Sequence, residues 1–146
     1  MSRAEAPRRD IYRCFVTIPT RWTDNDVYGH VNNIVYYAFF DTAINRRLIE
    51  KGVLDLAGSA TVGLVVESKC TYFSSLAFPN DVQVGLRVLH LGTSSVRYEV
   101  GIFRRDAQVA SAVGEFVHVY VKRGDNRATP IPDDVRVTLL ELMVPA

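Results

Sequence analysis

The stretch Arg21-Trp22-Thr23-Asp24-Asn25-Asp26-Val27-Tyr28-Gly29-His30-Val31-Asn32-Asn33 runs directly into the apolar segment Ile34-Val35-Tyr36-Tyr37-Ala38-Phe39-Phe40. Its polar half is rich in Asp, Asn and Gly, which stabilise turns or tolerate unusual backbone angles. Residues 34–49 contain neither Gly nor Pro, so we expect a helix there, with Asn32 or Asn33 as its N-cap and Gly52 just beyond its end. The stretch therefore predicts a polar loop that leads into a helix.

The first half of this helix is apolar on every side, and a helix of that kind is expected to be surrounded by protein. Its second half carries Arg46, Arg47 and Lys51, which favour the negative end of the helix dipole. A loop of acids and amides at the N-terminus of a buried helix offers a carboxylate and free backbone N–H groups. These are two groups that can act on a carbonyl substrate.

Length and composition limit the number of domains and the classes of partner and cofactor. The 146 residues are expected to form one domain, 1–146, in which residues 1–10 are a flexible tail. A formal net charge of +1 does not indicate a basic surface that binds nucleic acid, and no apolar run is long enough to span a membrane. Cys14 and Cys70 are expected to be free, buried thiols, and the ligand clusters of a metal site are missing from the sequence. We expect a cytoplasmic protein without metal or cofactor.

The rest of the chain reads as strands and one terminal helix. Strands are expected over 11–20, 61–73, 82–88, 96–102 and 109–121, and a short helix within 130–143. Short connections between the last four strands predict an antiparallel meander. The fold class is therefore α+β, with a curled five-stranded antiparallel sheet wrapped around one long central helix. Its outer face is expected to carry Arg87, Arg97, Glu99, Phe103, Phe116 and Tyr120. The apolar members of this face predict cover by another subunit, so we expect a homodimer or homotetramer.

The chain resembles the hotdog-fold thioesterases, in the branch that includes 4-hydroxybenzoyl-CoA thioesterase and the long-chain and Tol-Pal-associated acyl-CoA thioesterases. The segment Asp24-Asn25-Asp26-Val27-Tyr28-Gly29-His30-Val31-Asn32-Asn33 is similar to that branch's D-x-D-x-x-G-H-V-N-N pattern. A looser similarity spans 72–84, where Phe78-Pro79-Asn80-Asp81 replaces the branch's separate Pro and Gly. The resemblance covers nearly the whole chain.

The resemblance implies hydrolysis of an acyl-CoA thioester. It makes Asp26 the catalytic carboxylate and the backbone N–H of Asn33 the group that polarises the thioester carbonyl. The substrate-binding candidates that accompany them are His30, Asn32, Tyr37 and Asp41. Relatives bind CoA phosphates through basic residues between the third and fourth strands, but this chain has Leu91-Gly92-Thr93-Ser94-Ser95 there. The remaining phosphate candidates are Arg87, Arg104, Arg105, Lys122 and Arg123.

Each of these residues also has a simpler interpretation. Asp26 could be a nucleophile, a general base towards water, or an ordinary turn-capping residue. His30 could position substrate or water, or be a hydrogen-bonded structural group. Asp24 is expected to stabilise the loop by pairing with Arg21. An unpaired Asp41 within a buried helix would be costly, so it is expected either to find a partner or to border the site.

Three other functions remain open at this point. An acyl carrier protein could replace CoA as the carrier of the acyl group. A hydratase or dehydratase would use Asp26 and His30 as an acid/base pair, although the spacing differs from the hydratase pattern. A catalytically silent protein would only bind an acyl thioester, and the intact Asp26 argues against it.

Overall fold

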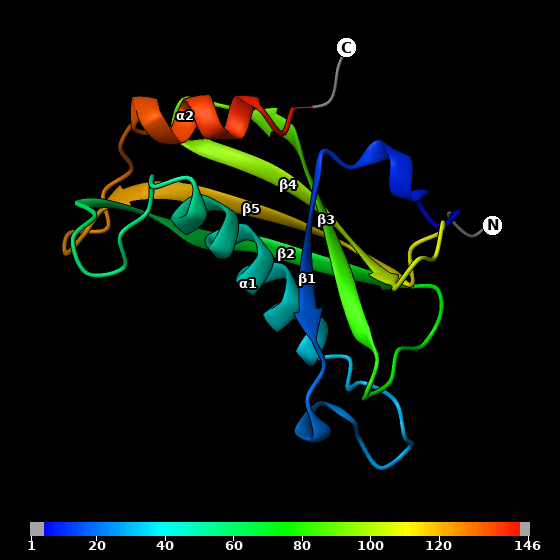
Figure 1. Cartoon of the computed structure of the whole chain (residues 1–146). Helices are drawn as coiled ribbons and strands as arrows, with labels where there is room; N and C mark the ends of the chain where they lie inside the picture. The colour runs from blue at the N-terminus through cyan, green and yellow to red at the C-terminus, as the bar shows by residue number, and fades with distance from the viewer. Residues whose placement is uncertain (1–4, 144–146) are drawn as a thin grey trace.

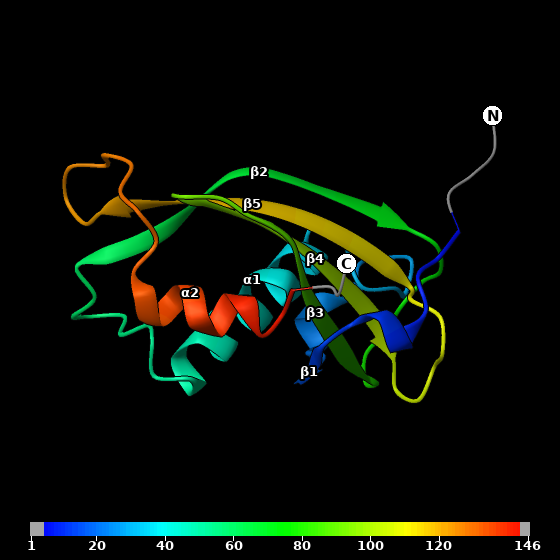
Figure 2. The same ribbon diagram turned by 90° about the horizontal axis from the view of Figure 1, so that it is seen from above.

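The computed structural model describes residues 5–143, which form one antiparallel sheet and two helices (Figure 1). The elements in chain order are β1 (Cys14–Pro19), α1 (Val35–Glu50), β2 (Thr61–Tyr72), β3 (Asp81–Leu91), β4 (Ser95–Arg104), β5 (Ala112–Lys122) and α2 (Asp133–Leu140). Two short 3-10 turns, Arg9–Ile11 and Trp22–Asp24, flank β1. The curled sheet carries α1 against one face (Figure 2), so the predicted hotdog architecture is confirmed.

The order of the strands differs from the expected four-strand meander. The sheet runs β1-β3-β4-β5-β2, so only β3, β4 and β5 follow one another as a meander. β2 pairs along its length with β5, from Thr61 opposite Lys122 to Tyr72 opposite Ala112. Residues 73–80 then return the chain to β3, two strands away from β5. The β-branched and aromatic residues over 61–73 predicted a strand but carried no information about its partner, because such residues indicate only that the backbone is extended.

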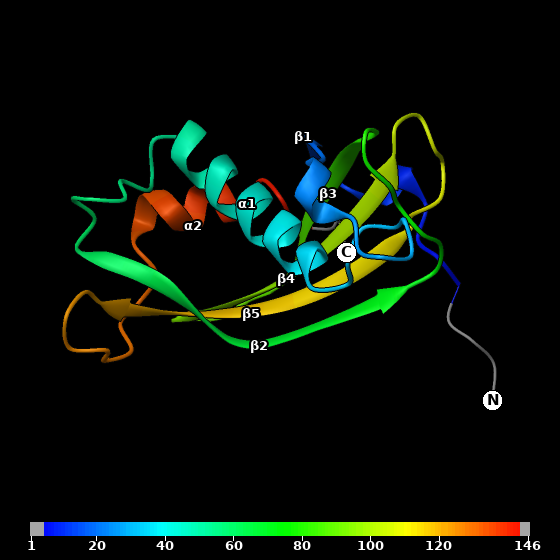
Figure 3. The same cartoon turned by 90° about the horizontal axis from the view of Figure 1, so that it is seen from below.

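The core between α1 and the sheet confirms the predicted alternation of β3 and β4. The inward side chains are at most 1% exposed and comprise Val82, Val84, Leu86, Val88, Val96, Tyr98, Val100 and Ile102. α1 contributes one stripe at three- and four-residue spacing, namely Tyr36, Phe39, Phe40, Ala43, Ile44 and Leu48. Ile34, Ala38 and Thr42 on its other side are exposed. The expectation of a surrounded helix was therefore wrong for the single chain, in which the sheet covers one side of α1 (Figure 3).

The inner face of β5 was also predicted with the wrong register. Ala112, Gly114, Phe116, His118 and Tyr120 face the core, whereas Val113, Val117 and Val119 are half-buried on the outer face. Val109 is exposed and precedes the strand. Both faces of this strand are apolar, so the alternation rule had no polar face to exclude. The aromatic face of β5 turns towards the core because Phe116 packs edge-on against Phe40 of α1, with ring centroids 5.5 Å apart.

Gly114 allows α1 to lie this close to the sheet. A Cβ placed on Gly114 would lie 2.5 Å from Cε2 of Phe40, well inside van der Waals contact. The Phe40 ring is fully buried and touches both Tyr37 and Phe116. The missing side chain at position 114 therefore sets the distance between α1 and β5.

The outer face carries charged pairs and a patch that the chain covers itself. Arg87 of β3 donates two hydrogen bonds, of 2.8 and 2.9 Å, to the carboxylate of Glu99 on β4. Phe103 is fully buried, but the residues that cover it are Tyr12 and Phe15 of the same chain. Phe103 therefore gives no evidence for cover by another subunit, and neither do the core residues Phe116 and Tyr120.

The N-terminal segment is held against the rest of the domain. Of the expected tail 1–10, residues 1–4 lie outside the described residues. The backbone N–H of Arg9 donates to the carbonyl of Gln108, and that of Ala110 donates to Pro7. Within residues 5–143, no helix has the length and apolarity needed to cross a membrane.

Candidate active site

The loop that precedes α1 is closed at its base by Asp24. This side chain is 1% exposed, and its carboxylate accepts hydrogen bonds from the backbone N–H of Arg21 at 2.7 Å and from the Arg21 guanidinium at 2.8 and 3.1 Å. The carbonyl of Asp24 accepts the N–H of Asn32 at 2.8 Å. The predicted Arg21–Asp24 pair is confirmed, and the backbone hydrogen bond between Asn32 and Asp24 brings the two ends of residues 24–32 together.

A second set of contacts attaches the loop to the segment that precedes β3. The amide oxygen of Asn25 accepts the backbone N–H of Phe78 at 3.0 Å. The N–H of Val31 donates to the carbonyl of Leu76 at 2.7 Å. Because residues 25 and 31 are both clamped, the intervening turn has a defined position beside the N-terminus of α1.

Asp26 lies in that turn. Its backbone N–H donates to the carbonyl of His30 at 2.9 Å, and its carbonyl accepts the N–H of Gly29 at 3.1 Å. Gly29 has a φ of 83°, a left-handed angle that glycine adopts without strain. The Oδ1 of Asp26 accepts the N–H of Tyr28 at 2.9 Å, while its Oδ2 accepts no hydrogen bond from residues 5–143. Asp26 thus caps a turn and also presents one free carboxylate oxygen from a half-buried position.

Asn33 lies just before α1 and is exposed. Its backbone N–H has no acceptor among the described residues, and its carbonyl accepts the hydroxyl of Tyr72 at 2.9 Å. The prediction that Asn32 or Asn33 is the N-cap was wrong, because the N-cap is Ile34 and no side chain caps the helix. Asn32 acts one step earlier, where its Oδ1 accepts the N–H of Ile34 at 3.2 Å. Ile34 has helical angles, so the helical path begins one residue after the asparagine pair.

The remaining expected site residues spread along α1 and the loop. His30 is exposed in the loop. Tyr37 is half-buried and stacks on Phe116, with ring centroids 6.1 Å apart. Asp41 is exposed, and its Oδ1 accepts the side-chain amide of Asn45 at 3.1 Å. Its carboxylate is therefore exposed to solvent and hydrogen-bonded to a neutral amide, contrary to the expectation of a buried position.

A hollow beside Asn33 was not anticipated from the sequence. It has a volume of about 300 Å³ and is lined by Val31, Asn33, Tyr36, Tyr72, Phe73 and Ser74. Tyr36 and Tyr72 pack edge-on with centroids 4.9 Å apart. Burial raises the pKa of both phenols, so each remains protonated at neutral pH and serves as a donor. The sequence signal for Tyr72 was its place at the start of the looser motif match over 72–84.

Residues 20–139 match the family described as the thioesterase-like superfamily. The chain belongs to the thioesterase-like superfamily. Its general chemistry is therefore thioester hydrolysis, and the resemblance to hotdog-fold thioesterases is confirmed.

Two solved structures from Pseudomonas aeruginosa are similar to this chain in both sequence and fold. The PA5185 protein of strain PAO1 is 51% identical to this chain and superposes on it with a TM-score of 0.94. The match covers 97% of this chain and 99% of the PA5185 chain. The PA2801 protein, named as a candidate thioesterase, is 35% identical to this chain, with a TM-score of 0.80. The match covers 88% of this chain and 98% of the PA2801 chain. No curated protein matches the sequence.

A third structure shares the fold alone. The 1,4-dihydroxy-2-naphthoyl-CoA thioesterase Slr0204 from Synechocystis is 14% identical with a TM-score of 0.78, covering 88% of this chain and 96% of its own. At this identity the match shows that the hotdog scaffold is shared.

Proposed function

We propose that the protein hydrolyses an acyl-CoA thioester at the loop that carries Asp26 and Asn33. The observation that supports this most directly is the combination of two unpaired groups on one clamped loop. Oδ2 of Asp26 has no hydrogen-bond donor among residues 5–143, and the N–H of Asn33 has no acceptor among them. A carboxylate oxygen and an N–H group that are free to contact substrate are the groups that attack on a carbonyl requires, and Asn33 borders the hollow described above.

Two chemical routes fit these groups. In the first, the Asp26 carboxylate attacks the thioester carbonyl, the C–S bond breaks, CoA leaves as thiolate, and water then hydrolyses the mixed anhydride. In the second, Asp26 takes a proton from a water molecule that attacks the carbonyl itself. In both routes the N–H of Asn33 donates to the oxyanion. The hydroxyl of Tyr72 bonds the carbonyl of Asn33 and so helps to hold this residue in place.

The same proposal assigns four residues to substrate contact. His30 and Asn32 lie in the loop, while Tyr37 and Asp41 are one turn apart on α1. Tyr37 offers an aromatic surface held by Phe116. Asp41 offers a carboxylate that only the Asn45 amide contacts among the hydrogen bonds of the described chain.

Arg104 and Arg105 are the best-placed phosphate contacts among the five cations considered from the sequence. Arg104 donates to the carbonyl of Ser75, and Ser75 also borders the hollow beside Asn33. Both arginines line an open depression of about 400 Å³ together with Asp81, whose charge opposes an anion there. Arg87 is committed to Glu99, so its charge is largely compensated. An acyl carrier protein remains the alternative carrier.

The proposal includes a homo-oligomer in the cytoplasm. β2 is the edge strand beyond β5, and its exposed side chains include Leu64, Val65 and Val66. An exposed edge with apolar side chains favours pairing with a second chain, which supports a homodimer or a homotetramer. Cys14 and Cys70 are free thiols, as is usual in a reducing compartment.

The test is release of CoA thiol from a panel of short, long and aromatic acyl-CoAs. Asp26→Asn keeps the shape of the side chain and removes its charge, and Asp106→Asn is the matched control in an exposed turn. We expect kcat/KM of Asp26→Asn to fall by about 10² or more, while Asp106→Asn stays at the wild-type value. Equal activity of Asp26→Asn and wild type would remove Asp26 from the mechanism.

A further inference from the structure

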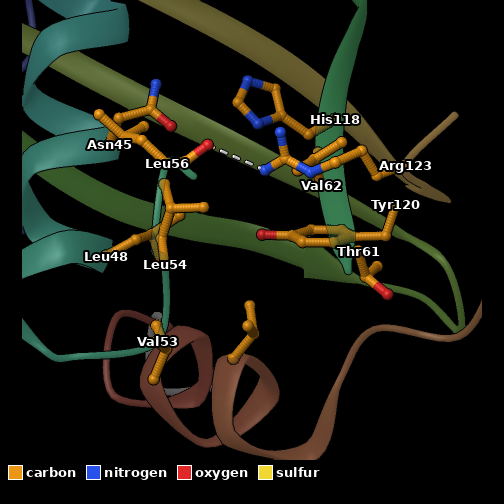
Figure 4. Close-up of a pocket in the computed structure, with 12 residues that line it drawn as sticks. Asn45, Leu48, Val53, Leu54, Leu56, Thr61, Val62, His118, Tyr120 and Arg123 are labelled. Atoms are coloured by element: carbon orange, nitrogen blue, oxygen red, sulfur yellow. Dashed lines mark hydrogen bonds between the residues drawn. The ribbon is translucent and has the colours of Figure 1, made fainter. Parts of the chain in front are cut away.

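Side-chain hydrogen bonds hold the connecting segments near both ends of α1. Near its C-terminal end, Arg123 donates to the carbonyl of Leu56 at 3.0 Å and holds the connection before β2 at the wall of a cavity of about 250 Å³ (Figure 4). Near its N-terminal end, the amide oxygen of Asn25 accepts the backbone N–H of Phe78 at 3.0 Å. Asn25 directly precedes Asp26, so this second hydrogen bond lies beside the proposed catalytic carboxylate.

The Asn25 side chain sets the position of the turn that contains Asp26. Three hydrogen bonds join Asp26 to the rest of its turn, and their partners are Tyr28, Gly29 and His30. These bonds fix the shape of the turn but not its position relative to α1. Among the hydrogen bonds of the described residues, the one from Phe78 to Asn25 is the only one that joins residues 25–30 to a segment outside the loop.

The segment that holds Asn25 also holds Asn33. Tyr72, at the end of β2, donates its hydroxyl to the carbonyl of Asn33 at 2.9 Å. The residue with the proposed oxyanion donor and the residue beside the proposed carboxylate are thus both attached to residues 72–78. This shared attachment fixes the two groups relative to each other.

Asn25 supplies its acceptor oxygen without a charge. On one side of it, Asp24 is buried and paired with Arg21, and on the other side Asp26 is half-buried. Asn25→Asp would keep an oxygen that accepts the same N–H. It would also place a third carboxylate between the two acids, and like charges favour the protonated form. The amide therefore holds the turn without opposing the negative charge of Asp26.

We propose that Asn25 is a positioning residue for the reaction, and that its amide oxygen keeps the Asp26 carboxylate within reach of the carbonyl that Asn33 polarises. This inference rests on the proposed function, because Asn25 acts through Asp26. Misplacing a reacting group by about 1 Å can lower a rate by up to about 10²-fold. The contact is therefore expected to affect kcat far more than KM.

Asn25→Ala and Thr20→Val are the matched variants. Thr20 donates its hydroxyl to the carbonyl of Asn80 at 2.7 Å, so it joins the same two stretches of chain without adjoining Asp26. We expect Asn25→Ala to lower kcat by about tenfold while KM stays within about twofold of wild type. Thr20→Val is expected to keep the wild-type kcat. Each variant loses one hydrogen bond between the same stretches, so urea denaturation should show similar losses of stability.

Asn25→Asp is the rescue variant, because it restores an acceptor for the Phe78 N–H. Its kcat is expected to return to within about threefold of wild type at pH 8. The added carboxylate should also move the acid limb of the pH profile of kcat/KM to higher pH by about half a unit, as a neighbouring charge in a solvated loop would give.

Amide hydrogen exchange gives a second measure that needs no turnover. The N–H of Asp26, which donates to His30, is expected to exchange about tenfold faster in Asn25→Ala and at the wild-type rate in Thr20→Val. If wild type hydrolyses no acyl-CoA, the proposed function falls and the exchange rates alone decide whether Asn25 holds the turn. The inference is overturned if Asn25→Ala keeps the wild-type kcat, if Thr20→Val loses as much kcat, or if the Asp26 exchange rate is unchanged.

Discussion

Replacing Gly114 by alanine tests how closely α1 is seated on the sheet. The new Cβ would lie 2.5, 2.7 and 2.9 Å from three carbons of the Phe40 ring. Carbon atoms normally approach to about 3.5–4.0 Å, so the overlap is about 1 Å. The ring is fully buried against Tyr37 and Phe116, which leaves displacement of α1 as the main way to relieve it.

We expect Gly114→Ala to lower the free energy of unfolding by about 1–3 kcal/mol, the usual cost of overpacking a core. At this chain length the melting temperature should fall by about 3–10 °C. Urea denaturation followed by circular dichroism gives the free energy directly. Gly63→Ala is the control, because a Cβ there would lie at an ordinary 3.4 Å or more from its neighbours.

A double-mutant cycle then identifies the clash. Phe40→Leu alone should cost about 1–2 kcal/mol through lost burial. If the Gly114 methyl meets the Phe40 ring, the double variant should be more stable than the sum of the two single effects predicts, by about 1 kcal/mol. Wild-type stability of Gly114→Ala, or additive effects of the two substitutions, would refute the close seating of α1 on β5.

Tyr72→Phe removes the hydrogen bond to the Asn33 carbonyl, so kcat should fall by about threefold to tenfold; unchanged kcat would deny Tyr72 a positioning role. His118 has a folded pKa below its usual 6.5, so the unfolded chain binds the proton first and stability is lost as pH falls below about 6.5. Urea denaturation between pH 5 and 8 should show a shallower loss for His118→Phe. Burial raises the pKa of Cys70 to about 11, and its alkylation by iodoacetamide at pH 8 should be at least tenfold slower than that of a free thiol. Arg104→Gln should raise KM for CoA thioesters while leaving that for pantetheine thioesters unchanged, and an equal effect on both would exclude a phosphate contact.

The features that the sequence predicted correctly are those set by strong local patterns. β3 and β4 alternate apolar and polar side chains, so their buried faces could be predicted directly from the amino-acid sequence. The helix that begins after Pro132 has acidic residues in its first turn, as expected from dipole and propensity. The Arg21–Asp24 pair followed from two opposite charges three residues apart.

The features that it missed depend on long-range partners. β5 has two apolar faces, so only packing against Phe40 decides that Phe116 turns inward. The pairing of β2 with β5 joins residues 61 and 122, and no local signal specifies it. The hollow beside Asn33 exists because Tyr72, at the end of β2, returns to the loop. Asp26 and Asn33 could be singled out from their motif, whereas their unpaired carboxylate oxygen and N–H group became visible only in the fold.

The most direct test of the Asp26 loop as the reaction site is titration with an acyl-CoA analogue in which a methylene replaces the thioester sulfur. The ketone keeps the carbonyl and cannot be hydrolysed, so backbone amide shifts report where it binds. We predict that the largest shift is at the N–H of Asn33, with smaller shifts at Asp26 and its turn. Saturable binding of an analogue of an active substrate that leaves the Asn33 amide unmoved would contradict the assignment.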